Sequence, residues 1–253
     1  MKTLPVVPIC DKQKLDISDS NLINDGLYRI CNVAIAGGGY DKLPKKIVET
    51  GIREDAYKYN KQFVVQLKGC PFKCKYCYVT PEGINGSAKN ISIIDIITDF
   101  YGSNTRVFHL MGGAPALYLD YWPDIINRLL SRVHVFHSDF ILLEAKYSVK
   151  QLMKIATSNS IYAVSVKAIR PKEYKERIGI EYTDKMDKLF WDNLYLIVNS
   201  DINYYITFTG MKWWEKILFW YKYITKLKHS PLKDFKKSYS IKINNYLAIQ
   251  TKL

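Results

Sequence analysis

Three cysteines within a stretch of eight residues impose the strongest constraint on how this chain can fold. Cys70, Cys74 and Cys77 are spaced C-x3-C-x2-C, and they follow an apolar run over 63–67 and a glycine, Gly69. A loop this tight brings three thiolates together, where they can hold one iron–sulfur cube and leave its fourth iron without a protein ligand. The spacing therefore predicts a metal loop at the end of a strand, with an open position for a substrate or cofactor.

The rest of the composition is that of a globular protein in a reducing compartment. The 253 residues can bury a substantial core, and no uncharged apolar run is long enough to predict a membrane span. The first ten residues lack the basic, apolar and small-residue segments of a secretory signal. Five cysteines, three of them clustered, argue against a disulfide framework. We expect a cytoplasmic protein.

Positive charge is concentrated near the C-terminus. The net charge is +13, and residues 211–253 contain ten lysines against only Glu215 and Asp234. A localised basic segment attracts acidic partners more effectively than a diffuse excess does. Contact of 211–253 with a membrane surface or a nucleic acid is therefore one expectation for this segment.

Apolar runs and helical periodicity alternate along the chain from residue 61 onward, which predicts repeated βα units and a parallel sheet that curls into a full or partial barrel. We expect an N-terminal extension over 1–60, a core over 61–210 and a C-terminal element over 211–253 within the same domain. The predicted strands cover 27–36, 63–67, 106–111, 140–144, 161–166, 195–198 and 204–208. The predicted helices cover 91–100, 123–131, 148–157, 185–190 and 211–228, with 80–90 as a loop.

Chemically distinctive residues follow several of these strands. The cysteine loop, the Gly112-Gly113 turn, Glu144 and Lys167 each come at the C-terminal end of a predicted strand. In parallel α/β barrels, functional sites gather at that end of the strands. The coincidence predicts one shared site.

The predicted helix over 211–228 has two dissimilar faces. Lysines and Glu215 fall on one face, and Trp213, Ile217, Tyr221 and Ile224 fall on the other. The apolar face is expected to pack on the core as the last helix of a barrel. An interfacial or partner-binding helix is the alternative, since tryptophan, tyrosine and lysine together suit a membrane surface.

Other motifs have simpler interpretations. The triple glycine over 37–39 is read as a flexible turn rather than a phosphate cradle, because no G-x-G-x-x-G helix start follows it. Cys10 and Cys31 are expected to be buried as small apolar residues. A zinc site is the alternative for the cysteine loop, with one histidine as its fourth ligand. The histidines considered are His109, His134 and His137.

The cysteine loop, with an aromatic residue, Tyr76, before its last cysteine, resembles the signature of the radical S-adenosylmethionine (SAM) superfamily. His109 to Pro115 (HLMGGAP) resembles the family's G-G-E-P turn after the second strand. Ser165-Val166-Lys167 resembles the D-x-K that ends the fourth strand in compact, activating-enzyme-type members. The resemblance extends over roughly residues 61–210.

This resemblance implies a partial (β/α)6 barrel of the radical SAM type, with an N-terminal extension and a C-terminal amphipathic helix. Cys70, Cys74 and Cys77 would ligate a [4Fe-4S] cluster, whose open iron binds SAM. Tyr76 would cover the adenine side, Glu144 would meet the ribose, and Lys167 would face the SAM carboxylate. The SAM amino group would be bound by the turn made of Gly112, Gly113, Ala114 and Pro115, and Ser165 would complete the cofactor site.

Two positions depart from the family pattern. Ala114 stands where the family usually has glutamate, so a carboxylate that helps to hold the SAM ammonium is missing, and Ser165 replaces an aspartate. Two outcomes follow from Ala114: SAM binds more weakly, or Glu82, Glu144 or an asparagine such as Asn199 compensates.

The resemblance implies an enzyme that cleaves SAM reductively, with electrons from a low-potential donor of the ferredoxin or flavodoxin type. The expected substrate of its 5′-deoxyadenosyl radical is a protein or peptide. An anionic nucleotide, nucleic acid or lipid is the alternative substrate, and a non-catalytic metal-binding protein is the alternative to an enzyme.

Overall fold

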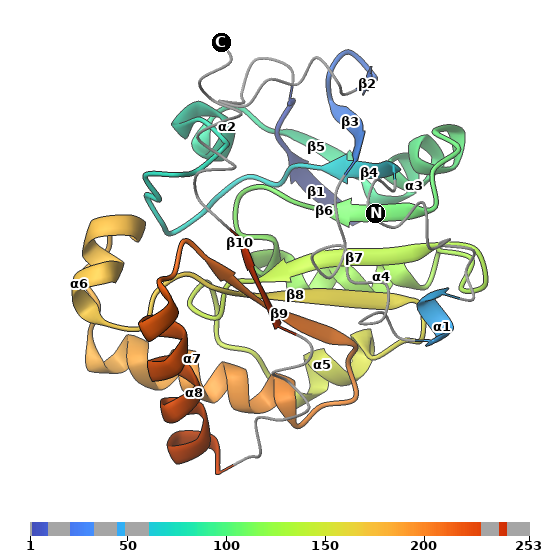
Figure 1. Ribbon diagram of the computed structural model, residues 1–253. Helices are drawn as coiled ribbons and strands as arrows, with labels where there is room; N and C mark the ends of the chain where they lie inside the picture. Colours follow the sequence, from blue (N-terminus) through green and yellow to red (C-terminus); the bar gives the residue numbers. More distant parts are fainter. Residues whose placement is uncertain (1, 10–20, 33–44, 49–60, 229–237, 242–253) are drawn as a thin grey trace.

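The computed structural model describes residues 2–9, 21–32, 45–48, 61–228 and 238–241, and a long parallel sheet forms its centre (Figure 1). The order of this sheet is β10-β9-β8-β7-β6-β4-β3-β2. Strands β4, β6, β7, β8, β9 and β10 run parallel, whereas β3 and β2 add antiparallel strands beyond β4. The strands cover Asn21–Ile23 (β2), Tyr28–Asn32 (β3), Lys61–Val65 (β4), Val107–Leu110 (β6), Val135–Phe140 (β7), Ser160–Val166 (β8), Tyr204–Thr209 (β9) and Ser238–Ile241 (β10).

A second, two-stranded sheet pairs β1 (Thr3–Val6) with β5 (Lys89–Ser92) in antiparallel register. The N-terminal strand also supports the start of the cysteine loop. Val7 N donates to Gln66 O at 2.9 Å, and Lys68 N donates to Pro5 O at 3.0 Å. Residues far apart in the sequence thereby hold the chain directly after β4 in an extended path.

The two faces of the main sheet differ because side chains alternate along each strand. One face, here called the helix face, carries Phe63, Phe108, Phe136 and Tyr162, which pack in the large core with residues of the surrounding helices. The other, the inner face, carries Val107, Val135, Ile161, Ala163 and Tyr205, which form a smaller cluster closed by Ile47 of α1 (Lys45–Val48).

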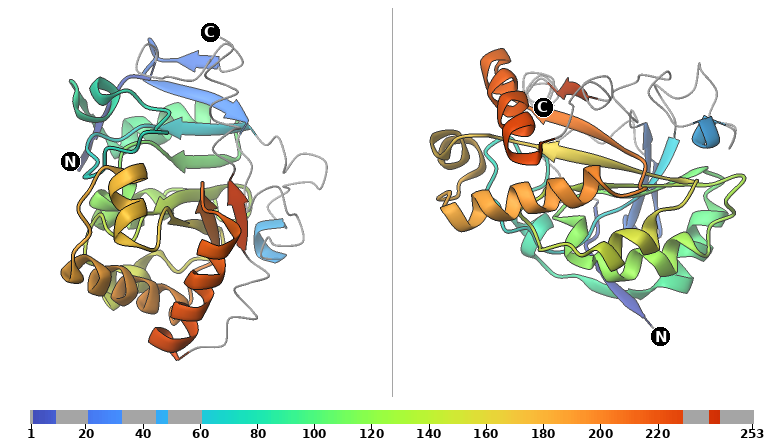
Figure 2. Two further views of the ribbon diagram at one scale, coloured as in Figure 1. Left: turned by 60° about the vertical axis from the view of Figure 1, so that its left-hand side comes forward. Right: turned by 90° about the horizontal axis from the view of Figure 1, so that it is seen from below.

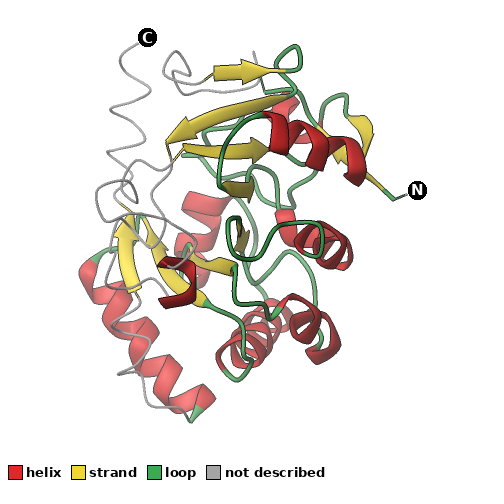
Figure 3. Ribbon diagram, turned by 90° about the vertical axis from the view of Figure 1, so that its right-hand side faces the viewer, coloured by secondary structure: helices red, strands yellow, loops and turns green. Residues whose placement is uncertain are grey.

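The helices are α2 (Pro81–Asn85), α3 (Ile93–Gly102), α4 (Trp122–Ile126), α5 (Val149–Ile155), α6 (Pro171–Glu173), α7 (Asp184–Val198) and α8 (Trp213–Leu227). Helices α3, α4, α5 and α7 lie on the outer side of the curved sheet, whereas α1 lies on its inner side (Figures 2 and 3). A 3-10 segment over Pro115–Tyr121 precedes α4, and a π-helical turn over Tyr174–Ile178 follows α6. Hydroxyl side chains cap several helix starts. Ser92, Ser148 and Thr183 each accept a hydrogen bond from the backbone N–H three residues later.

The structure confirms most predicted strands but corrects two. The third parallel strand is β7, Val135–Phe140, and the apolar run over 140–144 continues beyond it as a loop. The predicted strand over 195–198 is wrong, because those residues form the last turn of α7. The sixth parallel strand of the described chain is instead β10, so the partial barrel keeps six parallel strands with a different last member. The loop predicted over 80–90 contains α2 and the start of β5.

Helix α8 forms as predicted, but it buries the opposite face. Glu215, Phe219, Tyr223 and Leu227 point into the protein at intervals of four residues. Trp213 is 71% exposed, Ile217 59%, Tyr221 64% and Ile224 48%. The prediction that this apolar face packs on the core is therefore wrong.

Several sequence features lie outside the described residues: the triple glycine over 37–39, Cys10, the end of the predicted strand at 33–36, and 229–237 and 242–253 of the basic segment. Within the part of the chain that the structure describes, no helix has both the length and the apolarity needed to cross a bilayer.

Candidate active site

The cysteine loop is fixed at the C-terminal end of β4 by backbone hydrogen bonds to other elements. Gly69 N donates to Ile84 O of α2 at 2.6 Å, and Ala114 N donates to Gly69 O at 2.8 Å. On the other side, Lys73 N donates to Ile178 O at 2.9 Å and Lys75 N donates to Arg177 O at 3.0 Å. Helices α2 and α6 lie at the same end of the sheet (Figure 1). The loop is therefore held on one side by α2 and on the other by the π-helical turn that follows α6.

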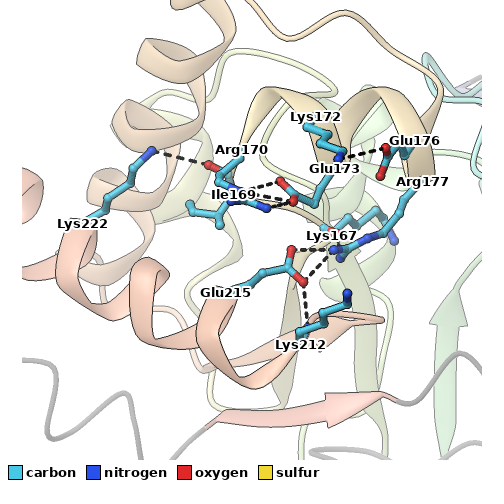
Figure 4. Close-up of polar contacts among 10 residues, drawn as sticks. All are labelled: Lys167, Ile169, Arg170, Lys172, Glu173, Glu176, Arg177, Lys212, Glu215 and Lys222. Carbon is cyan, nitrogen blue, oxygen red and sulfur yellow. Dashed lines mark hydrogen bonds and ion pairs between the residues drawn. The ribbon is translucent and has the colours of Figure 1, made fainter.

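A buried ion pair reinforces the second contact (Figure 4). The Arg177 guanidinium donates to both carboxylate oxygens of Glu215, at 2.5 and 2.6 Å, and Glu215 is fully buried. Glu215 also accepts from Lys212 N at 2.8 Å, and Arg177 Nη1 donates to Lys167 O at 3.5 Å. Arg177 thereby connects α8, the end of β8 and the cysteine loop.

The three loop cysteines are reduced and partly buried. Burial raises the pKa of Cys70 to about 12 and also raises the pKa of Cys74, while the nearby Lys167 opposes both shifts. Cys74 and Cys77 in turn act on the ionisation of Cys70, so the sulfurs lie near one another. Among the described residues, no three His, Cys, Asp or Glu side chains already have metal-ligand geometry. The donor set nevertheless fits a soft metal centre, since iron supplies the positive charge that buried thiolates require.

The Gly112-Gly113 turn packs directly against this loop. Both residues have positive φ, +93° and +67°. A Cβ on Gly113 would lie 2.4 Å from Leu67 O and 2.7 Å from Gly69 O. Ala114 and Pro115, which follow, are buried. Only glycine at 113 therefore lets the turn approach the cysteine loop this closely.

Glu144 lies in the loop after β7 and has one unsatisfied oxygen. Its Oε1 accepts from Ile141 N and from the Tyr147 hydroxyl, both at 2.8 Å. Its Oε2 is buried and has no hydrogen-bond partner among the described residues. Burial raises the pKa of Glu144 to about 7, although hydrogen bonding, chiefly from Ile141 N and the Tyr147 hydroxyl, opposes the shift. An unpaired buried carboxyl oxygen of this kind fits a hydroxyl ligand such as a ribose.

Ser165 and Lys167 follow one another on alternate positions at the end of β8. Ser165 is buried and opposite Thr207 of β9. Lys167 Nζ lies 5.9 Å from the centre of the Tyr76 ring, so the structure brings the predicted cation and the predicted adenine-side residue together.

Sequence reasoning missed Asp139, which belongs to the same group. Burial raises the pKa of Asp139 to about 6, against the opposing charge of Lys167, and the Asp139 charge acts on Glu144. Asp139 lies outside the strand predicted over 140–144, which begins five residues after β7 does. In the sequence Val135–Phe140, His137 and Asp139 alternate with Phe136, Ser138 and Phe140, and that period-2 pattern could have identified both.

The residues predicted to compensate for the missing carboxylate at Ala114 differ in their positions in the structure. Asn199 is exposed at the end of α7, where its amide donates to Tyr195 O, so the expectation that it compensates is wrong. Glu82 is exposed on α2. Asp139 and Glu144 remain as candidates, since Lys167 acts on the ionisation of Asp139 and Asp139 acts on that of Glu144.

The three histidines considered as zinc ligands do not form a fourth ligand position. His109 and His137 are stacked on each other at 4.1 Å between ring centres, within β6 and β7. His137 is bonded to Gln62 at 3.3 Å and to the Tyr205 hydroxyl at 2.7 Å. His134 instead accepts from Leu130 N and packs on Phe100.

Comparison with known proteins identifies the family. The model of the radical SAM superfamily matches residues 64–210, which include the cysteine loop, the glycine turn, Glu144 and Lys167. The chain therefore belongs to the radical SAM superfamily. Members of this superfamily are enzymes, and membership implies SAM-dependent radical chemistry with SAM and an iron–sulfur cluster as cofactors.

A solved structure with a TM-score just above 0.5 has a similar fold. A structure of TYW1 with a lysine-pyruvate adduct bound has a TM-score of 0.51 and 13% sequence identity, covering 82% of this chain and 73% of that chain. Native anSMEcpe with bound AdoMet has a TM-score of 0.49 and 13% identity, over 69% of this chain and 49% of that chain. The chain thus spans about half the length of anSMEcpe. No curated protein matches the sequence.

Proposed function

We propose that this chain cleaves SAM reductively at a [4Fe-4S] cluster held by Cys70, Cys74 and Cys77, and that the radical abstracts hydrogen from a bound substrate. The observation that carries the proposal is the placement of the cysteine loop against the glycine turn, at the same end of a parallel sheet as Glu144 and Lys167. When bound, the cluster supplies the electron for SAM cleavage, and SAM supplies the 5′-deoxyadenosyl radical.

The protein's own contribution would be to bind, orient and desolvate SAM. Backbone groups of the turn over 112–115 would bind its amino end, and the orphan Oε2 of Glu144 would accept from a ribose hydroxyl. Lys167 would pair with the carboxylate, an interaction that is stronger in a buried site than in water. Tyr76 would lie along the adenine, and Ser165 would add a hydroxyl beside Lys167.

Asp139 extends this assignment beyond the sequence prediction. Its carboxyl lies on the inner face near Lys167 and Glu144, and it would replace the missing glutamate at Ala114 as the partner of the SAM ammonium. A cation at that position would favour the ionised form of Asp139 and lower its pKa from about 6.

The substrate, the electron donor and the location complete the proposal. The substrate would be a protein or peptide, as in compact activating-enzyme-type members, and the electron would come from a ferredoxin or flavodoxin type of donor. The reduced cysteines favour the cytoplasm. An anionic small molecule is the second candidate substrate, and a buried arginine on the inner face, described below, favours it.

The test is anaerobic reconstitution with iron and sulfide, followed by addition of SAM and dithionite. We expect a brown protein that forms 5′-deoxyadenosine. Cys74→Ala should lose both properties, whereas Cys31→Ala, on β3 outside the loop, should keep them. A colourless protein that binds zinc would contradict the proposal, and a metal-loaded protein that never cleaves SAM would support a non-catalytic role.

A further inference from the structure

A buried arginine without an acidic partner lies on the inner face of the sheet. Arg29 on β3 is 6% exposed, and its Nε has no hydrogen-bond partner among the described residues. No carboxylate of the described chain forms an ion pair with it. Its guanidinium lies near the ring of Tyr78, whose centre is 5.9 Å from Cζ. A largely buried guanidinium without a counter-ion is costly, and such groups are normally paired.

A second unsatisfied side chain lies in the same row across the sheet. Arg29 pairs in register with Val64, and Val64 pairs with His109, so Arg29 and His109 are two strands apart, about 10 Å along the row. Both ring nitrogens of His109 are buried and lack a hydrogen-bond partner among the described residues, and the residue is 2% exposed. Burial, His137 and Arg29 lower the pKa of His109 well below its usual value, so the ring is neutral and presents one donor and one acceptor.

The neighbouring side chains limit which groups can hydrogen-bond to Arg29 and His109. His137 is committed to Gln62 and Tyr205, and it fixes His109 by stacking. The residue between the two groups, Val64, is apolar and buried. On its other side Arg29 faces Tyr78, the residue after Cys77. The unsatisfied pair, Arg29 and His109, therefore lies on the inner face of the sheet, and its arginine lies next to the residue that follows the last cysteine of the loop.

We propose that Arg29 and His109 bind an anionic group of the substrate, a carboxylate or a phosphate, within the barrel. The planar guanidinium suits either oxyanion by donating two hydrogen bonds, and the neutral imidazole adds a third donor. The group would be held beside the cysteine loop, and the substrate would present its reacting carbon toward SAM. The inference rests on the proposed function for its assignment to substrate, whereas anion binding can be measured without any reaction.

The test measures the melting temperature of the reconstituted protein with inorganic phosphate or with acetate, which distinguishes the two oxyanions. At ten times its dissociation constant, the anion that binds should raise the melting temperature by about 4 °C. Arg29→Met should lose this shift and should melt higher than the wild type without anion, since it removes an unpaired buried charge. His109→Leu should weaken binding about tenfold. Arg132→Gln, which alters an exposed arginine, should keep the full shift.

Three results would overturn the inference. One is a wild type whose melting temperature responds to neither anion. Another is a shift that persists in Arg29→Met, which would reflect screening of the +13 net charge. The third applies if Arg29→Met does not fold. Arg29→Lys should then fold and bind the anion at least fivefold more weakly. Unchanged anion binding by Arg29→Lys would contradict a role for the planar guanidinium. Formation of 5′-deoxyadenosine in the same wild-type preparation tests the proposed function separately.

Discussion

Glu144 makes the stability of this protein depend on pH. Its pKa is raised from 4.5 to about 7 in the folded state by burial, so the folded protein holds this proton more tightly than the unfolded chain does. The contribution of this group to stability is then fully present below pH 4.5 and is lost as the pH rises through 7, a change on the order of 3 kcal/mol. Glu144→Gln should flatten that decline, as measured by urea unfolding at pH 5 and pH 8. An unchanged slope in the variant would contradict the assignment.

Gly113 makes a second prediction at the scale of one residue. Gly113→Ala places a methyl group against two carbonyl oxygens at a backbone angle that other residues avoid, so the turn or the cysteine loop must move. We expect a loss of about 2–4 kcal/mol in the free energy of unfolding and less iron bound after reconstitution. Gly102→Ala is the matched control, since nothing lies near its Cβ, and it should be neutral or slightly stabilising. Equal iron content in both variants would argue against close packing of the turn.

At the scale of elements, α8 is tied to the site by one buried carboxylate. Glu215→Ala would leave the largely buried guanidinium of Arg177 without its partner. We expect a loss of about 3–5 kcal/mol, measured by chemical unfolding. Glu176→Ala removes an exposed pair with Lys172 at 3.9 Å and should cost less than about 1 kcal/mol. Similar losses of unfolding free energy in both variants would mean that the buried pair stabilises the protein no more than the exposed pair does.

The orientation of α8 can be tested in the same way. Phe219 is fully buried, so Phe219→Ala should cost about 3–5 kcal/mol, whereas Ile217→Ala, on the exposed side, should cost less than about 1 kcal/mol. The reverse order, measured by thermal unfolding, would restore the orientation that the sequence predicts.

These elements also show why sequence patterns succeed and fail here. The strands β8 and β9 are predicted almost to the residue because their central positions are buried on both faces and read as continuous apolar runs. Tyr195 to Val198 has strand-like composition, but the chain before it is already helical from Asp184, and continuing a formed helix costs less than starting a strand. On α8, Glu215 is buried by its bond to Arg177, a partner that periodicity within one helix cannot reveal.

At the scale of the whole molecule, the site divides into a predictable and an unpredictable part. The cysteine loop, the glycine turn and Lys167 follow their strands directly, so strand order alone brings them to one end. Asp139, Arg29 and His109 come from the middle of strands, where only register decides which side chains share a face. The register of β3 with β4 is set by a pairing between segments about 35 residues apart, which no local pattern specifies.

The contacts of Arg177 have a practical consequence for the stored protein. Its carbonyl accepts from Lys75 N of the cysteine loop, while its side chain binds Glu215 of α8, so undocking of that helix would displace a residue that supports the loop. The rate of bleaching of a reconstituted sample would then depend on whether α8 stays docked, and not on the chemistry of the thiolates alone. This helix lies more than 130 residues after the cysteine ligands in the sequence. The rate at which a stored sample loses its brown colour would then report how stably α8 is docked.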